Sequence, residues 1–99
     1  MSWTVFFTSE SEKMLLGIQD RRIRRLIMSK AMGLKTNPDL QGKPLTGEMA
    51  GLRSVRAVGQ RHRIIYELFP DAHEVWIIAV GIRKAGNRDD IYELAKRLK

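Results

Sequence analysis

The feature that most constrains the fold is an unbroken apolar run near the C-terminus, Val-Trp-Ile-Ile-Ala-Val at residues 75–80. Successive side chains of a strand point to opposite faces, so a run that is apolar at both parities predicts a central strand covered on both faces. Even when it is extended to Ile82, the run is well below the roughly 18–20 residues that span a bilayer. The first residues also lack the basic segment of a signal peptide, so we expect a cytoplasmic protein with no membrane contact.

Two further strand patterns precede this run. Residues 52–58 and 62–69 are candidate strands, separated by the turn Gly59-Gln60. The segment 70–73, Pro-Asp-Ala-His, predicts the next turn, and residues 74–82 form the third strand. We therefore expect an antiparallel meander over the second half of the chain.

The N-terminal half predicts one strand followed by two helices. Residues 3–8 are aromatic and β-branched, and Ser9 with Glu12 forms a capping box at the start of a helix. Asp20 is a plausible cap for a second helix, which Asn37-Pro38 ends because a residue before proline avoids the α region. The two helices are expected to form a helical hairpin.

The remaining segments complete the predicted order of elements. Residues 38–51 hold two prolines and three glycines and are typical of a loop. A last helix is expected after Asn87 as its cap, with Ile91, Leu94 and Leu98 on its apolar stripe and Asp89 and Asp90 at its start. The order strand, helix, helix, three strands, helix predicts an α+β fold in a single domain, residues 1–99. We expect a four-stranded, antiparallel-dominated sheet with the hairpin on one face and the C-terminal helix beside the other.

Charge gives the first indication of function. The chain has 18 Lys and Arg against 11 Asp and Glu, a net charge of +7, and the basic residues are clustered in segments 21–35 and 53–63, which hold no acid. Clustering of this kind favours a polyanionic or acidic partner, although a solvated basic face without a target has the same composition. The absence of cysteine excludes disulfides, thiolate metal sites and cysteine nucleophiles. His62 and His73 are too few for a zinc site, so we expect neither a metal nor a cofactor.

Two arginines at strand positions indicate where an anion could bind. Arg63 shares one strand face with Ile65 and Glu67, and Arg83 follows the end of the apolar central strand. On antiparallel neighbours the two arginines would approach each other, and they would repel unless an anion lay between them. The same pattern also fits an ordinary half-exposed strand.

The segments that hold these arginines carry a family resemblance. The sequence GKPLTGEMAGLRSVRAVGQRHRIIY, and after a hairpin VWIIAVGIRKAGNRDDIYELAKRL, resembles the RelE side of the RelE/ParE superfamily of toxins from type II toxin–antitoxin modules. The resemblance covers nearly the whole chain, and its HRIIY and VGIRK…DDIY motifs are moderately specific together. It implies an endoribonuclease that cleaves mRNA on the ribosome without a metal and thereby inhibits translation. It also implies a cognate antitoxin that holds the toxin in a hetero-oligomer.

The resemblance assigns roles to individual residues. Arg63 matches the arginine that contacts the scissile phosphate, Arg83 the arginine that stabilises the transition state or protonates the leaving group, and Tyr92 the tyrosine that stacks on a base or positions the 2′-OH. These three residues are the implied catalytic set. The residues expected to bind RNA around them are Arg53, Arg56, Arg61, Lys84 and Arg88, of which Arg53 and Arg56 match the family's basic pair only loosely.

One departure from the family leaves the general base unassigned. Where relatives have lysines, this chain offers arginines, which stay protonated and are poor bases. Histidine is a common general base, but strand parity points His62 away from Arg63. Two other functions therefore stay open: a ParE-like inhibitor of DNA gyrase without nuclease activity, and a basic adaptor for an acidic partner.

Overall fold

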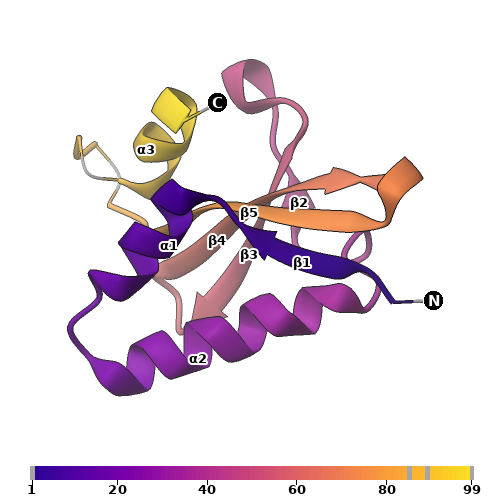
Figure 1. Ribbon diagram of the computed structural model, residues 1–99. Helices are drawn as coiled ribbons and strands as arrows, with labels where there is room; N and C mark the ends of the chain where they lie inside the picture. The colour runs from indigo at the N-terminus through magenta and orange to yellow at the C-terminus, as the bar shows by residue number, and fades with distance from the viewer. Residues whose placement is uncertain (1, 85, 89, 99) are drawn as a thin grey trace.

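The computed structural model describes residues 2–84, 86–88 and 90–98, and its centre is a five-stranded sheet (Figure 1). The strands lie in the order β1-β5-β4-β3-β2. The central strands are β5 (Glu74–Ile82), β4 (His62–Phe69) and β3 (Leu52–Val58), which pair antiparallel as the meander predicted. β1 (Thr4–Phe7) is parallel to β5 and forms one edge of the sheet. The predicted α+β class and order of elements are confirmed.

The strand count differs from the prediction by one. β2 (Lys43–Pro44) lies inside the segment 38–51 that was expected to be a loop, and it forms the second edge by pairing antiparallel with β3. A strand of two residues is too short to show the alternation of apolar and polar residues that predicts a strand. Its position is fixed by long-range contacts instead. The sheet therefore has five strands rather than four.

One face of the sheet is covered by the two helices of the predicted hairpin. α1 (Ser9–Leu16) contacts β5, and α2 (Arg21–Met32) crosses the sheet on β3 (Figure 1). The shared core of this face contains residues from both helices, from the 3₁₀ turn after α2 and from three strands. It includes Leu15, Ile27, Ala31, Leu34, Val55, Ile64, Tyr66, Val75, Ile77 and Val80.

α3 (Ile91–Leu98) lies on the other face. Its buried residues Ile91 and Ala95 pack against Leu52, Ile65 and Ala79 in a smaller core. Because α3 has only eight residues, it covers part of this face and leaves the ends of β3 and β4 open beside it. Among the described residues, no helix is long and apolar enough to cross a membrane.

Two of the predicted helix caps were wrong. Thr8, not Ser9, caps α1, because its side chain accepts a hydrogen bond from the Ser11 backbone N–H at 3.1 Å. At α3 the cap is Asp90, not Asn87: Asp90 Oδ2 accepts from the Tyr92 N–H at 2.9 Å. Asp89, the other acid expected at this helix start, lies outside the described residues. The Asp20 cap of α2 is confirmed, with bonds from the N–H groups of the second and third helical residues.

Candidate anion-binding site

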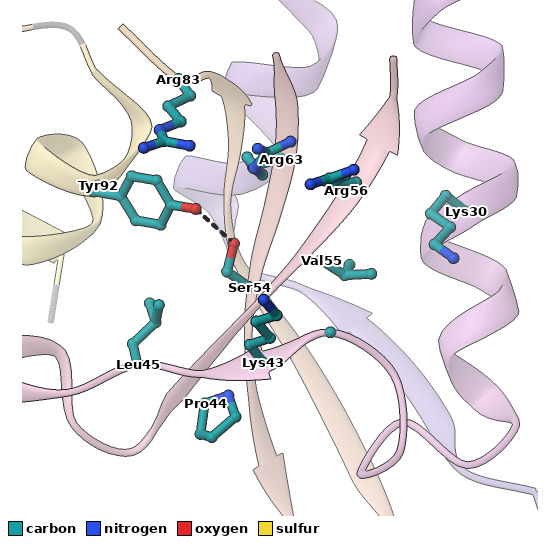
Figure 2. Close-up of a pocket in the computed structure, with 11 residues that line it drawn as sticks. Lys30, Lys43, Pro44, Leu45, Ser54, Val55, Arg56, Arg63, Arg83 and Tyr92 are labelled. Carbon is teal, nitrogen blue, oxygen red and sulfur yellow. Dashed lines mark hydrogen bonds between the residues drawn. The ribbon is translucent and has the colours of Figure 1, made fainter. Parts of the chain in front are cut away.

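An open cavity of about 590 Å³ lies where β2, β3 and β4 meet α3 and the end of β5 (Figure 2). Five basic side chains line the cavity, and no acidic side chain of the described residues does. They are Lys30, Lys43, Arg56, Arg63 and Arg83. None of the five has an ion-pair partner among the residues that the structure describes. The cavity is therefore a concentrated positive site.

Arg63 is the buried member of this set. Only 6% of its surface is exposed, and its Nη1 is the one buried side-chain nitrogen or oxygen that lacks a hydrogen-bond partner within the described parts of the chain. A buried guanidinium without a partner is costly, because its desolvation is not offset by a hydrogen bond. The position of Arg63 in the cavity wall therefore favours an acceptor from outside the chain.

Arg56 lies directly opposite Arg63. The two residues are Cα partners in the antiparallel pair of β3 and β4, so their side chains share one face of the sheet. Like charges at opposite positions of a sheet destabilise it. A phosphate between the two guanidiniums would convert this repulsion into a set of charge-assisted hydrogen bonds.

Arg83 completes the row of arginines at the edge of the cavity (Figure 2). Its backbone N–H donates to the Arg61 carbonyl at 2.8 Å, which extends the pairing of β4 and β5 past the end of the strand. The Arg83 side chain is exposed. Arg83, Arg63 and Arg56 thus come from three adjacent chain segments, as expected for side chains that grip one extended ligand.

Tyr92 closes the opposite side of the cavity. It follows the first residue of α3, and its hydroxyl lies 3.0 Å from the Ser54 hydroxyl, within hydrogen-bond distance (Figure 2). The Asp90 cap fixes the start of the helix and so sets the position of the Tyr92 ring. Ser54 is buried on β3, two residues before Arg56 and on the same face.

Several solved structures similar to this chain are toxins, some of them in toxin–antitoxin complexes. The structure of the RelBE2 toxin–antitoxin complex from Mycobacterium tuberculosis contains a chain that is 31% identical, with a TM-score of 0.75 over 84% of this chain and 93% of that one. The chain belongs to the RelE-like toxin superfamily. No protein-family model and no curated protein sequence matches it.

Two more distant structures share the RelE-like fold. The isolated E. coli RelE toxin is 17% identical, with a TM-score of 0.71 over 99% of this chain and 100% of that one. The YoeB/ParE toxin from Agrobacterium tumefaciens is 22% identical, with a TM-score of 0.68 over 82% of this chain and 99% of that one. Identities this low establish the fold alone.

The structure brings together the three residues of the predicted RelE-like catalytic set. Arg63, Arg83 and Tyr92 all line the cavity, although they come from three different elements. Of the five residues predicted to bind RNA, Arg56 joins them. His62 does not line the cavity, in agreement with its strand parity.

The other predicted RNA-binding residues lie elsewhere, and Arg53 differs most from the expectation. It pairs with Tyr66 on the face covered by α2, and its Nη2 donates to the Gln41 carbonyl at 3.0 Å. Its odd distance from Arg56 along β3 puts the two side chains on opposite faces. Arg53 therefore holds a loop and does not line the cavity, and its contact with RNA stays a prediction.

The last three predicted contacts do not line the cavity. Arg61 is exposed in the turn between β3 and β4. The Lys84 backbone N–H donates to the Asp90 carboxylate, which ties the segment after β5 to the start of α3. Arg88 is exposed on the loop before α3 and borders a separate shallow depression. They remain predictions as peripheral RNA contacts.

Three polar side chains of the cavity were missed by the sequence analysis. Ser54 could have been found, because the predicted strand 52–58 already puts it on the same face as Arg56. Lys30 lies in the basic segment 21–35 but on a helix that was assigned to the opposite face. Lys43 lies in the segment read as a loop, and no local pattern indicates that it faces the cavity.

Proposed function

We propose that this protein is the toxin of a type II toxin–antitoxin system and that it acts as an endoribonuclease on mRNA. The observation that carries the proposal is the buried guanidinium of Arg63, which faces Arg56 in the cavity. Among the described residues its Nη1 has no hydrogen-bond partner and no acidic side chain lines the cavity. Such a cavity fits a phosphodiester, whose non-bridging oxygens accept bidentate hydrogen bonds from arginine. Membership of the RelE-like superfamily supports RNA as the source of that phosphate.

The chemistry proposed is attack of a ribose 2′-hydroxyl on the adjacent phosphate. Arg63 and Arg83 bind the phosphoryl oxygens and stabilise the negative charge that grows on them in the transition state. Positioning and electrostatics supply much of the acceleration in phosphoryl transfer, so a cage of cations suits this step. None of the described residues that line the cavity supplies a carboxylate or an imidazole, and we propose that the reaction runs without a metal.

Tyr92 is proposed to hold the nucleotide beside the scissile phosphate. Its ring lines the cavity and its hydroxyl is fixed by Ser54, so one face of the ring is available to stack on a base. We propose the ribosome as the place where the mRNA is presented, which puts the activity in the cytoplasm.

Mapping of RNA ends tests this function directly. After brief expression in cells, primer extension on abundant mRNAs is expected to show new 5′ ends in a codon-phased pattern, and purified protein with programmed ribosomes is expected to give the same ends in the presence of EDTA. Arg63→Ala is the matched inactive variant. Intact mRNA together with a loss of DNA supercoiling would instead identify a gyrase inhibitor, the activity that ParE-like members of the superfamily would predict.

We also propose a cognate antitoxin as the partner that forms a hetero-oligomer with this toxin. The M. tuberculosis relative was crystallised as a toxin–antitoxin complex. On this chain, the sheet face that carries α3 also holds half-buried Phe6 and Trp76, stacked with ring centroids 4.8 Å apart. An acidic, amphipathic segment could fold onto apolar and basic surface of this kind.

Co-expression tests the partner. A small open reading frame adjacent to the toxin gene is expected to restore growth, and its product to co-purify with the toxin and block mRNA cleavage. If no adjacent reading frame restores growth and the isolated protein is harmless to cells, the toxin–antitoxin assignment fails.

A further inference from the structure

Lys43 reaches the cavity from a strand that the rest of the site does not use. It belongs to β2, and its Cα partner on β3 is Ser54. Residues opposite each other in an antiparallel pair share one face, with Cβ atoms about 4.5–5.5 Å apart. Since the Ser54 hydroxyl contacts the Tyr92 hydroxyl at 3.0 Å, the Lys43 side chain lies beside the Ser54–Tyr92 pair, as Figure 2 shows.

Hydrogen bonds from two side chains of the sheet fix the segment before Lys43. The Tyr66 hydroxyl, on a fully buried side chain, lies 2.8 Å from the Pro38 carbonyl oxygen and 2.7 Å from that of Gln41. Arg53 adds its own bond to Gln41 at 3.0 Å. These contacts connect the centre of the sheet to a surface segment and fix the point from which β2 starts.

Gly42 brings the two strands close enough for this arrangement. Its φ is +63°, and a Cβ at this position would lie 2.3 Å from the Ser54 carbonyl oxygen. Only glycine adopts this backbone conformation without cost and leaves room for the neighbouring strand. The backbone position of Lys43 is therefore fixed, although its side chain is exposed at the surface of the cavity.

The remaining groups of the cavity are poor proton acceptors. Arginines stay protonated, so Arg56, Arg63 and Arg83 can stabilise charge but cannot accept a proton. The Tyr92 hydroxyl is engaged with Ser54. Lys30 comes from α2, the helix on the opposite face, and Figure 2 shows it on the side of the cavity away from Tyr92.

We propose that Lys43 is the general base of the RNA cleavage, an inference that rests on the function proposed above. Lysine, unlike arginine, can lose its proton and act as a base. The base that the strands β3 and β4 lack is thus supplied by the short edge strand β2. In the step itself the 2′-hydroxyl O–H bond breaks and its proton passes to the free amine of Lys43. The 2′-oxygen bonds to phosphorus and the bond from phosphorus to the 5′-oxygen breaks.

The protons and products of this step balance with water as the only co-reactant. The leaving 5′-oxygen takes a proton from water, and the hydroxide so formed takes the proton from the Lys43 ammonium, which regenerates the amine. The products are a 2′,3′-cyclic phosphate and a 5′-hydroxyl.

The variant Lys43→Arg distinguishes a role of Lys43 in proton transfer from a role as a positive charge. Because the variant keeps the charge and loses the base, we expect its single-turnover rate constant for RNA cleavage to fall about 10²–10⁴-fold, as in Lys43→Ala. Lys13→Arg, at an exposed position of α1 outside the cavity, is the matched control and is expected to stay within a few-fold of the wild-type rate. Binding of an RNA with a 2′-deoxy nucleotide at the cleavage site is expected to be unchanged in Lys43→Arg, because the phosphate contacts remain.

Chemical rescue and a pH profile complete the experiment. Ethylamine in solution is expected to restore part of the activity of Lys43→Ala but not of Lys43→Arg, whose side chain fills the site. The rise of the wild-type rate with pH is expected to be lost in both variants. The charged and titratable groups that face Lys43 are the same in all these proteins, namely Arg56, Arg63, Arg83, Lys30 and Tyr92.

The outcomes distinguish this inference from the proposed function. If the wild type cleaves RNA and Lys43→Arg cleaves it equally fast, Lys43 is a phosphate contact only and the inference is wrong while the function stands. If Lys30→Arg is inactive and Lys43→Arg active, Lys30 is the base instead. If the wild type leaves RNA intact, with or without ribosomes, the proposed function fails and the role of Lys43 fails with it.

Discussion

The two faces of the sheet differ in whether the chain supplies the partners of its buried groups. Under α2, the buried side chains of β4 and β5 on this face are apolar except for the Tyr66 hydroxyl, which contacts two loop carbonyls, so no buried side-chain polar group described on this face lacks a partner. On the other face, α3 also covers apolar side chains at one end of the sheet, where Ile65 and Ala79 pack against Ile91. At the other end Arg63 is buried opposite Arg56 with no acceptor.

Because of this difference, a single strand contributes to stability with the residues on one face and to function with the residues on the other. Ile64 and Arg63 are neighbours on β4, yet the first is a fully buried core residue and the second a buried cation whose Nη1 has no partner among the described residues. Because adjacent residues of a strand point to opposite faces, one strand can serve a core and a binding site without compromise between them. The apolar face stabilises the fold, and the cationic end of the other face carries a cost that a bound anion would offset.

The largest effect on stability is expected from the apolar face. Ile77 is fully buried in the core under α2, and Ile77→Ala is expected to lower the free energy of unfolding by about 2–5 kcal/mol, the range for isoleucine deletions that leave a cavity. Urea denaturation measures the loss. Ile78→Ala, at a half-buried neighbour, is the control and is expected to lose less. Equal losses in both variants would contradict the difference between the faces.

Arg83→Ala tests the cationic end. The side chain is exposed, so we expect almost no change in melting temperature. RNA cleavage is expected to fall about 10²–10³-fold, the cost of removing one donor to a developing oxyanion, and growth inhibition should be relieved. Arg22→Ala removes an exposed arginine of α2 that does not line the cavity and should retain most of the activity. A large drop in melting temperature for Arg83→Ala would make Arg83 structural and remove it from the catalytic set.

Tyr66→Phe tests the connection between the apolar face and the site. It removes the hydroxyl that contacts two loop carbonyls, so we expect a loss of about 1–3 kcal/mol in unfolding free energy, the cost of leaving buried polar groups unpaired. The cleavage rate is also expected to fall, because this loop leads into Lys43. A variant that loses stability and keeps full activity would separate the loop from the site.

Tyr66 should also make stability depend on alkaline pH. Burial raises the pKa of the Tyr66 hydroxyl above its ordinary value of 10.0, and the hydrogen bond from Arg53 opposes this shift in part. With the folded pKa above the unfolded one, the unfolded chain binds fewer protons in the window between the two values, so stability falls as pH rises through it. Below pH 10 the contribution is complete. Denaturation curves from pH 9 to 11 should show the decline in the wild type and a smaller decline in Tyr66→Phe.

Much of this architecture could be predicted from local patterns, and the failures have physical reasons. The run at residues 75–80 identifies the central strand because a strand that is buried on both faces has a continuous apolar sequence. The parity of Arg63 and the position of Arg83 after β5 correctly placed both arginines in one site. Lys43 could not be found, because Tyr66 and Arg53, both distant in sequence, fix the segment before it. Arg53 was grouped with Arg56 because the family motif was matched there without applying the parity of β3.

The smallest effect on stability is expected from Arg63→Met, and it bears most directly on the difference between the faces. Methionine has a similar length and is apolar, so it removes a buried charge and its repulsion with Arg56 while it keeps most of the packing. Replacement of buried charges by apolar groups is often neutral or stabilising, and we expect the free energy of unfolding to stay the same or rise by about 1 kcal/mol. RNA cleavage should be lost in the same protein. Ile64→Met, next to it on the apolar face, is the control and should lose stability and keep activity. If Arg63→Met destabilises the fold as much as Ile77→Ala does, the guanidinium has partners within the chain, and the argument for an external anion is wrong.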